Sequence, residues 1–233
     1  MKVDECFGPT VQGEGAQAGA VTMFVRLGGC DYRCSWCDTM HAVDPDNAPR
    51  WREMDPDDIA EEVKALVPTH PEGTWVTISG GNPAIWQKEL SRLVLALNDK
   101  GFRVNIETQG SVPNEAFWYA DMVTISPKGP SSGMTLDRDK LKACMNQAGM
   151  KAVLKFVVAN DQDFAFAVDV ASHYPHVDTY VQPITITDKV GHEKRAFPTY
   201  RRLCERVATT PALSHWRVIP QLHVLAWGGE RGR

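Results

Sequence analysis

The side chains in the sequence best suited to bind a metal are three closely spaced cysteines near the N-terminus. Cys30, Cys34 and Cys37 lie within the segment "GGCDYRCSWCDT", whereas the other three of the six cysteines are far apart in the sequence. Gly28 and Gly29 before the cluster favour a loop over a helix. A loop allows three sulfur atoms to converge on one metal centre, so the spacing predicts a metal site.

Several interpretations of these cysteines are open at this point. On one face of a helix they would be three small buried residues, and in an oxidising compartment they would form disulfides. A structural zinc ion takes four ligands, of which His41 could supply the fourth, and the protein would then be a zinc-binding interaction module. An iron–sulfur cluster held by three cysteines instead leaves one iron open for a substrate or cofactor.

The composition is typical of a globular protein, with 233 residues of which 43% are hydrophobic and 23% charged. We expect one domain over residues 1–233. The formal net charge of −4 and the pI near 6.0 do not indicate a nucleic-acid or anionic-membrane partner, so the expected partner is a small molecule. The sequence shows neither a leader pattern nor a stretch apolar enough to span a membrane, which predicts a cytoplasmic protein with reduced thiols.

Short apolar, β-branched segments alternate with helical patterns along the chain. Six of these segments predict buried strands, at residues 21–27, 74–79, 102–108, 122–128, 152–158 and 178–184. The clearest helices are expected at about 56–67, with Asp55 as N-cap, and at about 87–100, ending at Gly101. Residues 172–178 and 187–198 are expected to be loops. This order predicts an α/β fold, an incomplete, open (βα) barrel of about six parallel strands.

The unusual polar and glycine-rich segments fall where the predicted strands end. They are "GGC", "SGGN", "ETQG", "SPKG" and "QPIT". Because the carboxyl ends of parallel strands meet at one edge of the sheet, we expect one functional site there.

The spacing C-x3-C-x2-C, with Trp36 directly before Cys37, resembles the signature of the radical S-adenosylmethionine (SAM) family. The resemblance implies that Cys30, Cys34 and Cys37 hold a 4Fe-4S cluster whose open iron binds the amino and carboxylate groups of SAM. It also implies an electron donor such as flavodoxin, because the reduced cluster of this family cleaves SAM to a 5′-deoxyadenosyl radical.

The segment "SGGNP" resembles the Gly-Gly-Glu-Pro motif of the same family, which lies against the SAM amino group. Asn82 replaces the usual glutamate, and its amide oxygen accepts a hydrogen bond without carrying a charge. The strand-end segments also resemble those that line the SAM pocket. The cofactor-binding residues implied are Trp36, Cys37, Asp38, Gly80, Gly81, Asn82, Glu107, Thr108, Ser126, Pro127, Lys128 and Gln182.

The segments "PTVQGEGAQAG" and "IPQLHVLAWGGERG" resemble the small radical SAM enzymes of 7-deazapurine (queuosine-type) biosynthesis, over nearly the whole chain. That resemblance implies ring contraction of 6-carboxy-5,6,7,8-tetrahydropterin with loss of ammonia, started by hydrogen abstraction at C6, and it suggests a homodimer. A glycyl-radical-enzyme activase, which shares the cluster, the Gly-Gly segment and the small size but acts on a protein, stays an alternative.

The implied substrate has a carboxylate and a pterin edge, and the sequence offers side chains for both. Arg26 is a candidate bidentate clamp for the carboxylate, and Gln12 and Glu14 are candidates to bind the amide and amino edge. Thr39 matches the position whose hydroxyl contacts Mg²⁺ in these enzymes, and His223, expected in an apolar strand, is a further candidate. The substrate-binding residues expected are Val11, Gln12, Gly13, Glu14, Arg26, Ser79 and His223.

Overall fold

A nine-stranded sheet runs through the computed structural model, which describes residues 1–67, 69, 72–184, 193–228 and 230–232. The strand order is β3-β1-β2-β4-β5-β6-β7-β8-β9. The strands from β2 to β9 are parallel, and only β1, between β2 and β3, is antiparallel to its neighbours. The bounds are β1 Lys2–Val11, β2 Val21–Leu27, β3 Arg52–Glu53, β4 Trp75–Gly80, β5 Arg103–Thr108, β6 Met122–Ile125, β7 Ala152–Val158, β8 Thr179–Pro183 and β9 Arg217–Val218.

The predicted fold class is therefore confirmed. The six predicted strands correspond to β2, β4, β5, β6, β7 and β8, which form the main part of an open parallel sheet. The N-terminal strand β1 and the two-residue strands β3 and β9 were not predicted.

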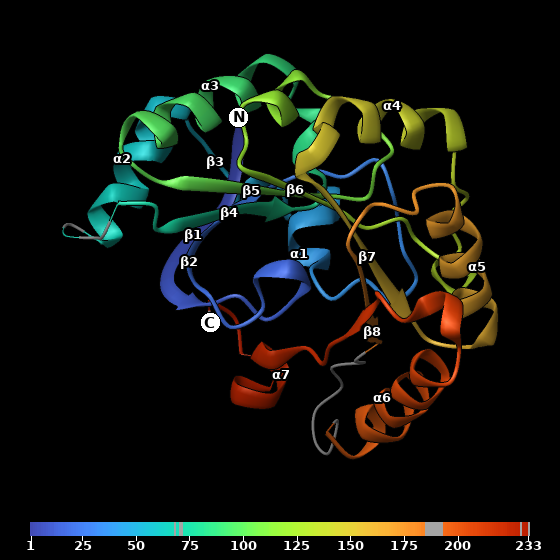
Figure 1. Ribbon diagram of the computed structural model, residues 1–233. Helices are drawn as coiled ribbons and strands as arrows, with labels where there is room; N and C mark the ends of the chain where they lie inside the picture. Colours follow the sequence, from blue (N-terminus) through green and yellow to red (C-terminus); the bar gives the residue numbers. More distant parts are fainter. Residues whose placement is uncertain (68, 70–71, 185–192, 229, 233) are drawn as a thin grey trace.

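Helices cover the outer face of this sheet (Figure 1). The main ones are α2 (Pro56–Leu66), α3 (Gln87–Asp99), α4 (Arg138–Ala148), α5 (Asp161–Ser172) and α6 (Glu193–Ala208), with the short α1 (Met40–Val43) and α7 (Leu222–Trp227) near the inner side. Asp55 caps α2, as predicted, by accepting a hydrogen bond from the backbone of Asp57. None of the described helices has the length and apolar character needed to cross a bilayer.

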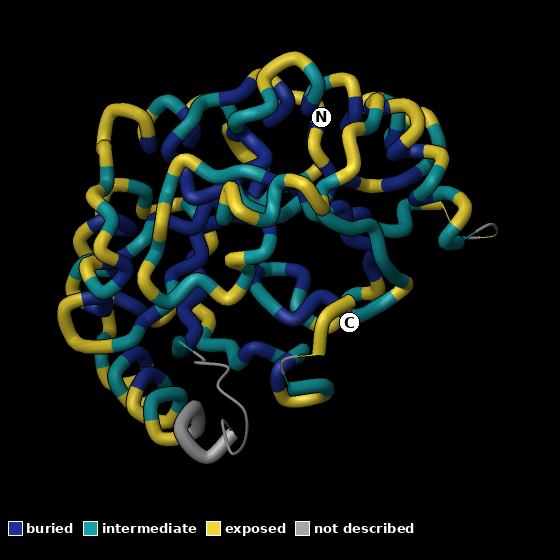
Figure 2. Tube along the Cα trace, turned by 180° about the vertical axis from the view of Figure 1, so that it is seen from behind, coloured by how far each residue is buried: buried dark blue, intermediate teal, exposed yellow. Residues whose placement is uncertain are grey.

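The two faces of the sheet differ in chemistry, and this difference separates the core from the site. Residues such as Ile78 and Ile106 are fully buried in the apolar core, toward the covering helices. The opposite face carries polar residues, among them Thr77, Thr124 and Lys155. Figure 2 shows buried backbone inside and exposed backbone along the outer helices. The inner face of the open barrel is therefore available for a polar site.

The C-terminal segment connects the edge strand β9 with the side of the sheet that contains β1. It leaves β9 at one edge, and its Leu222 amide donates a hydrogen bond of 3.0 Å to the carbonyl of Gly13. Arg231 then pairs with Asp4 at 2.8 Å and with Glu5 at 3.0 Å on β1. The first and last parts of the chain thus meet across the opening of the barrel.

Two details of the sequence prediction are wrong. His223 lies in α7 rather than in a strand, because a short apolar segment does not by itself distinguish strand from helix. The predicted loop at 187–198 is helical from Glu193 onward, where α6 begins, and its earlier residues lie outside the described part of the chain.

Candidate active site

A cavity of about 220 Å³ opens on the inner side of the barrel, at the carboxyl ends of the parallel strands. Its walls come from segments that are far apart in the sequence, as expected for this edge of a parallel sheet. Most of the predicted site residues line it, namely Val11, Gln12, Gly13, Glu14, Arg26, Cys30, Cys34, Trp36, Cys37, Asp38, Thr39, Ser79, Gly80, Gly81, Glu107, Thr108, Ser126, Lys128 and His223.

The cysteines lie on an irregular loop between β2 and α1, so the prediction of a loop rather than a helix is confirmed. This loop packs directly against the glycine pair that follows β4. A side chain at Gly81 would place its Cβ only 2.0 Å from the carbonyl oxygen of Gly29 and 2.9 Å from Cβ of Cys30. Only glycine allows the two loops to approach this closely.

The spacing of the three sulfur atoms argues against a single zinc ion. Among the residues that the structure describes, the only group of three potential ligands within 4.8 Å of one another is Asp4, Glu5 and His41. The cysteine sulfurs are therefore spread more widely than the ligands of one tetrahedral ion. His41, the proposed fourth zinc ligand, lies 2.7 Å from Asp4 through Nδ1 and is not in the cavity wall.

Wider spacing fits a cluster in which each thiolate binds a different iron. Burial raises the pKa of the Cys34 thiol to about 11, and it also raises the pKa of Cys30. Metal ligation requires thiolates, so cluster assembly at these positions releases protons. The donor set, three cysteines facing one cavity, therefore fits a 4Fe-4S cluster with one iron left for another ligand.

A neighbouring loop holds the cysteine loop in place. Trp36 donates a hydrogen bond of 2.9 Å from its indole nitrogen to the hydroxyl of Ser131, and Ser35 donates to the carbonyl of the same serine at 2.9 Å. The backbone amide of Ser131 in turn donates to the buried carboxylate of Asp163 at 3.0 Å. The position of the cysteine loop thus depends on a chain of hydrogen bonds that reaches α5.

Asn82 lies outside the cavity wall, unlike the other residues of the "SGGN" segment. Its side chain is fully buried, and its amide nitrogen donates to Asp31 at 2.8 Å and Ser111 at 3.2 Å. Its amide oxygen accepts from the hydroxyl of Thr108 at 2.8 Å and from the amide of Ala84 at 3.2 Å. These bonds tie the cysteine loop to the ends of β4 and β5, which is a structural role. Pro127 and Gln182 are likewise absent from the cavity wall.

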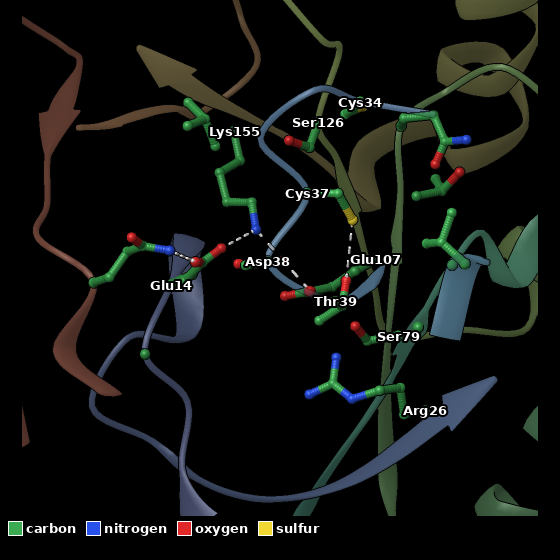
Figure 3. Close-up of a pocket in the computed structure, with 18 of the residues that line it drawn as sticks. Glu14, Arg26, Cys34, Cys37, Asp38, Thr39, Ser79, Glu107, Ser126 and Lys155 are labelled. Atoms are coloured by element: carbon green, nitrogen blue, oxygen red, sulfur yellow. Dashed lines mark hydrogen bonds and ion pairs between the residues drawn. The ribbon is translucent and has the colours of Figure 1, made fainter. Parts of the chain in front are cut away.

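A group of five polar residues occupies the opposite wall of the cavity. Glu14 pairs with Lys155 and accepts a hydrogen bond from the side chain of Gln221. Lys155 also lies 4.0 Å from Glu107, which accepts a 3.1 Å hydrogen bond from the amide nitrogen of Gln12. Figure 3 shows Lys155 extending between the two carboxylates. This wall presents fixed hydrogen-bonding groups to whatever enters the cavity.

The charges in this wall keep Glu14 ionised. Burial alone would raise the pKa of Glu14, but the charges of Lys155 and His223 and the hydrogen bonds from Lys155 and Gln221 hold it well below its usual range. Burial would lower the pKa of Lys155, but the neighbouring Glu107 and Glu14 raise it above its usual value. Both groups therefore carry their full charge at neutral pH.

Several cavity residues were not among the predicted site residues. They are Phe7, Phe24, Tyr32, Val43, Gln109, Lys155, Val157, Ile184 and Gln221. Lys155 had a signal in the sequence, because a lysine in the middle of the apolar segment "AVLKFVV" is rare in a buried strand. Gln221 had no comparable signal.

The comparisons with known proteins agree with this geometry. The family model described as "Radical SAM superfamily" matches residues 24–155, more than half of the chain. The chain therefore belongs to the radical SAM superfamily, an enzyme class whose 4Fe-4S cluster and SAM fit the three cysteines and the loops around them.

Curated relatives give a narrower assignment. The chain is 40% identical over its full length to "7-carboxy-7-deazaguanine synthase" of Bacillus cereus, and 39% identical to the protein of the same name from Bacillus subtilis, with 98% of each relative covered. Within the superfamily, the chain belongs to the 7-carboxy-7-deazaguanine synthase family.

A solved structure supports the fold. The crystal structure of QueE from Escherichia coli superimposes with a TM-score of 0.65 at 23% identity, covering 94% of this chain and 93% of that one. The open, largely parallel sheet of this chain is thus the fold of that structure.

Proposed function

We propose that this protein converts 6-carboxy-5,6,7,8-tetrahydropterin to 7-carboxy-7-deazaguanine and ammonia, the product that the name of its relatives states. The reaction needs no net oxidant, because substrate and product differ by one molecule of ammonia. A 4Fe-4S cluster held by Cys30, Cys34 and Cys37, together with SAM, would supply the radical chemistry for hydrogen abstraction at C6 of the substrate. The protein's own side chains bind and orient the pterin.

The observation that carries this proposal is the meeting of three chemically different groups in one cavity. The cysteine loop forms one part of the wall, Arg26 another, and the group of Gln12 and Glu14 a third. The guanidinium of Arg26 can pair with the carboxylate of the substrate. The side-chain amide of Gln12 and the carboxylate of Glu14 can donate and accept the hydrogen bonds that the amide and amino edge of a pterin requires. The cavity therefore offers a partner for each polar end of the proposed substrate.

We assign the cofactor contacts to the loops at the strand ends. This assignment covers the backbone of Gly80 and Gly81 and the side chains of Ser126 and Lys128, and it is supported by the fact that all four line the same cavity as the cysteines. Lys128 donates a hydrogen bond of 3.1 Å to Ser126, so the two side chains act together. Holding the cofactor and the substrate in one enclosed space brings the reacting atoms together.

The experiment that tests the function is anaerobic incubation of the reconstituted protein with SAM, a reductant, Mg²⁺ and 6-carboxy-5,6,7,8-tetrahydropterin. We expect 5′-deoxyadenosine and 7-carboxy-7-deazaguanine without any partner protein, which distinguishes the enzyme from a glycyl-radical-enzyme activase. Formation of 5′-deoxyadenosine without the deazaguanine would refute the substrate while leaving the enzyme class intact.

Three further features belong to the same proposal. Thr39 would provide a hydroxyl ligand to Mg²⁺, which takes few protein ligands because it keeps waters and binds substrate oxygens. A small electron-transfer protein such as flavodoxin would reduce the cluster, and two copies of the chain would form a homodimer. Product formation with and without a chelator tests the Mg²⁺ requirement. Reduction assays test the electron donor, and sedimentation analysis tests the homodimer.

A further inference from the structure

Lys155 is a charged residue buried in an otherwise apolar strand. Every other residue of β7, from Ala152 to Val158, is apolar, and the side chain of Lys155 is only 8% exposed. Burying an ion pair costs desolvation, and replacing both of its members by well-packed apolar side chains is often neutral for stability. The lysine therefore calls for an explanation other than stability.

The contacts of Lys155 connect it to the part of the cavity that faces the pterin in the proposed function. Its ammonium group binds Oε2 of Glu14, whose Oε1 accepts from Gln221, so both carboxylate oxygens are fixed in direction. The backbone amide of Glu14 donates to Oε1 of Gln12 at 3.1 Å, and Nε2 of Gln12 donates to Glu107. These bonds fix the orientation of the Gln12 amide together with that of Glu14.

The surrounding charges show why a cation is needed there. Lys155 on β7 is faced by Glu14, by Glu107 from β5 and more distantly by Asp38 from the cysteine loop. Glu14 is also faced by His223 from α7. Without Lys155, Glu14 and Glu107 would share a buried wall with no ammonium between them. Burial without a neighbouring cation would disfavour the ionised form of Glu14, and a protonated Glu14 would present a donor instead of an acceptor.

We propose that Lys155 is a positioning residue for substrate recognition, which fixes Glu14 as an ionised acceptor facing the donor edge of the heterocycle. The inference rests on the proposed function for the identity of that heterocycle. Lys155 is not a general base, because its two carboxylate partners keep it protonated. It acts through Glu14, and it makes the cavity selective for rings that present adjacent N–H donors.

The test measures binding rather than turnover. The reconstituted holoenzyme with SAM is dialysed to equilibrium against 6-carboxypterin, the oxidised analogue of the substrate, between pH 5.5 and 8.5. For Lys155→Met we expect binding weaker than that of the wild type by on the order of 30-fold at pH 6, because one partner of a buried charge pair is lost. The ratio of the two dissociation constants should narrow as the pH rises and Glu14 ionises.

Two variants serve as controls. Lys155→Arg retains the positive charge, so it should weaken the binding of 6-carboxypterin less than Lys155→Met does. Its dissociation constant relative to that of the wild type should not change with pH. Lys142→Met removes an exposed lysine on α4, outside the cavity, and should bind as the wild type does. Comparing each variant with the wild type at the same pH removes any titration of the ligand itself.

The double variant Glu14→Gln with Lys155→Met tests whether the lysine acts through Glu14. We expect it to bind no more weakly than Glu14→Gln alone, with no added pH dependence. The positioning role would be overturned if the losses of affinity caused by Glu14→Gln and Lys155→Met added up in the double variant. It would also be overturned if the loss of affinity in Lys155→Met did not depend on pH. If the wild type itself failed to bind 6-carboxypterin, the proposed function would fall as well, so the two failures are distinguishable.

Discussion

Arg26 donates a hydrogen bond of 2.8 Å from Nε to Oε1 of Glu5, its antiparallel neighbour on β1. Arg231 from the C-terminal segment binds the other oxygen of Glu5 at 3.0 Å. Figure 3 shows the guanidinium group of Arg26 directed into the cavity. Because the bond to Glu5 uses Nε, it orients the planar group while the terminal amino groups face the position proposed for the substrate carboxylate.

This relationship predicts a loss of carboxylate recognition in Arg26→Lys. Lysine retains the charge but not the planar fork, so 6-carboxypterin should bind about tenfold more weakly or worse. Pterin without the 6-carboxylate should bind equally to both proteins, as measured by equilibrium dialysis. Arg138→Lys, on the exposed surface of α4, is the matched control. An equal loss for both ligands would show that Arg26 supports the fold rather than the carboxylate.

The cysteine loop predicts which thiols hold iron. Replacing Cys30, Cys34 or Cys37 by alanine should abolish the brown colour and the iron and sulfide content of the reconstituted protein. Cys144→Ala should retain both, because Cys144 is buried in α4 and its pKa is raised to about 12. Iron and sulfide analysis checks the result. A colourless wild type with about one zinc per chain would contradict the cluster.

The sequence predicts those parts of the fold that follow from local pattern. Strands β2 and β7 begin and end where their apolar, β-branched segments do. The strand β1 lacks that pattern, since most of its residues are half-buried and it contains Gly8 and Pro9. It forms because it pairs with β2 and β3, which is a tertiary effect.

The same distinction applies to the site. The sequence predicted that the strand-end segments form one site, because a parallel topology brings them to one edge of the sheet. This prediction required no knowledge of side-chain contacts. Asn82 was expected at the cofactor, whereas its amide is taken up by Asp31, Ser111 and Thr108. Those partners come from two other segments, the cysteine loop and the end of β5, so the hydrogen bonds of Asn82 could not be read from the segment "SGGN". For Gln221, likewise, only the fold brings it to Glu14.

The hydrogen bonds of Asp163 connect α5 to the loop that holds the cysteine loop, so we expect a change at Asp163 to affect both the stability of the protein and the retention of the cluster. Its carboxylate accepts hydrogen bonds from the amides of Ser131 at 3.0 Å and Ala159 at 2.9 Å. Asp163→Ala leaves these amides without their acceptor, which should lower the free energy of unfolding by about 2 kcal/mol. Because Ser131 holds Trp36, the variant should also lose its cluster faster in the presence of an iron chelator.

Asp99→Ala, an exposed aspartate at the end of α3, is the control for this variant. It should unfold at the same urea concentration as the wild type and keep its cluster equally long. If Asp163→Ala lost stability but lost its cluster no faster than the wild type, the hydrogen bonds that Ser35 and Trp36 donate to Ser131 would not be what holds the cysteine loop.

The pair of Glu14 and Lys155 predicts how stability depends on pH. Because the folded protein holds the pKa of Glu14 below its unfolded value, the stabilisation is complete above the ordinary glutamate range and is lost as the pH falls. Lys155 has the opposite shift, so its contribution is lost only as the pH rises beyond the ordinary lysine range. Glu14→Gln should therefore cost about 3 kcal/mol of unfolding free energy near pH 7. That difference should be constant between about pH 6 and 9 and shrink below about pH 4.

Urea unfolding of the wild type and of Glu14→Gln under identical anaerobic conditions measures this difference, with the exposed Glu115→Gln as control. A difference that grew as the pH fell would mean that Glu14 is protonated in the folded protein, and the charge assignment of this wall would be wrong.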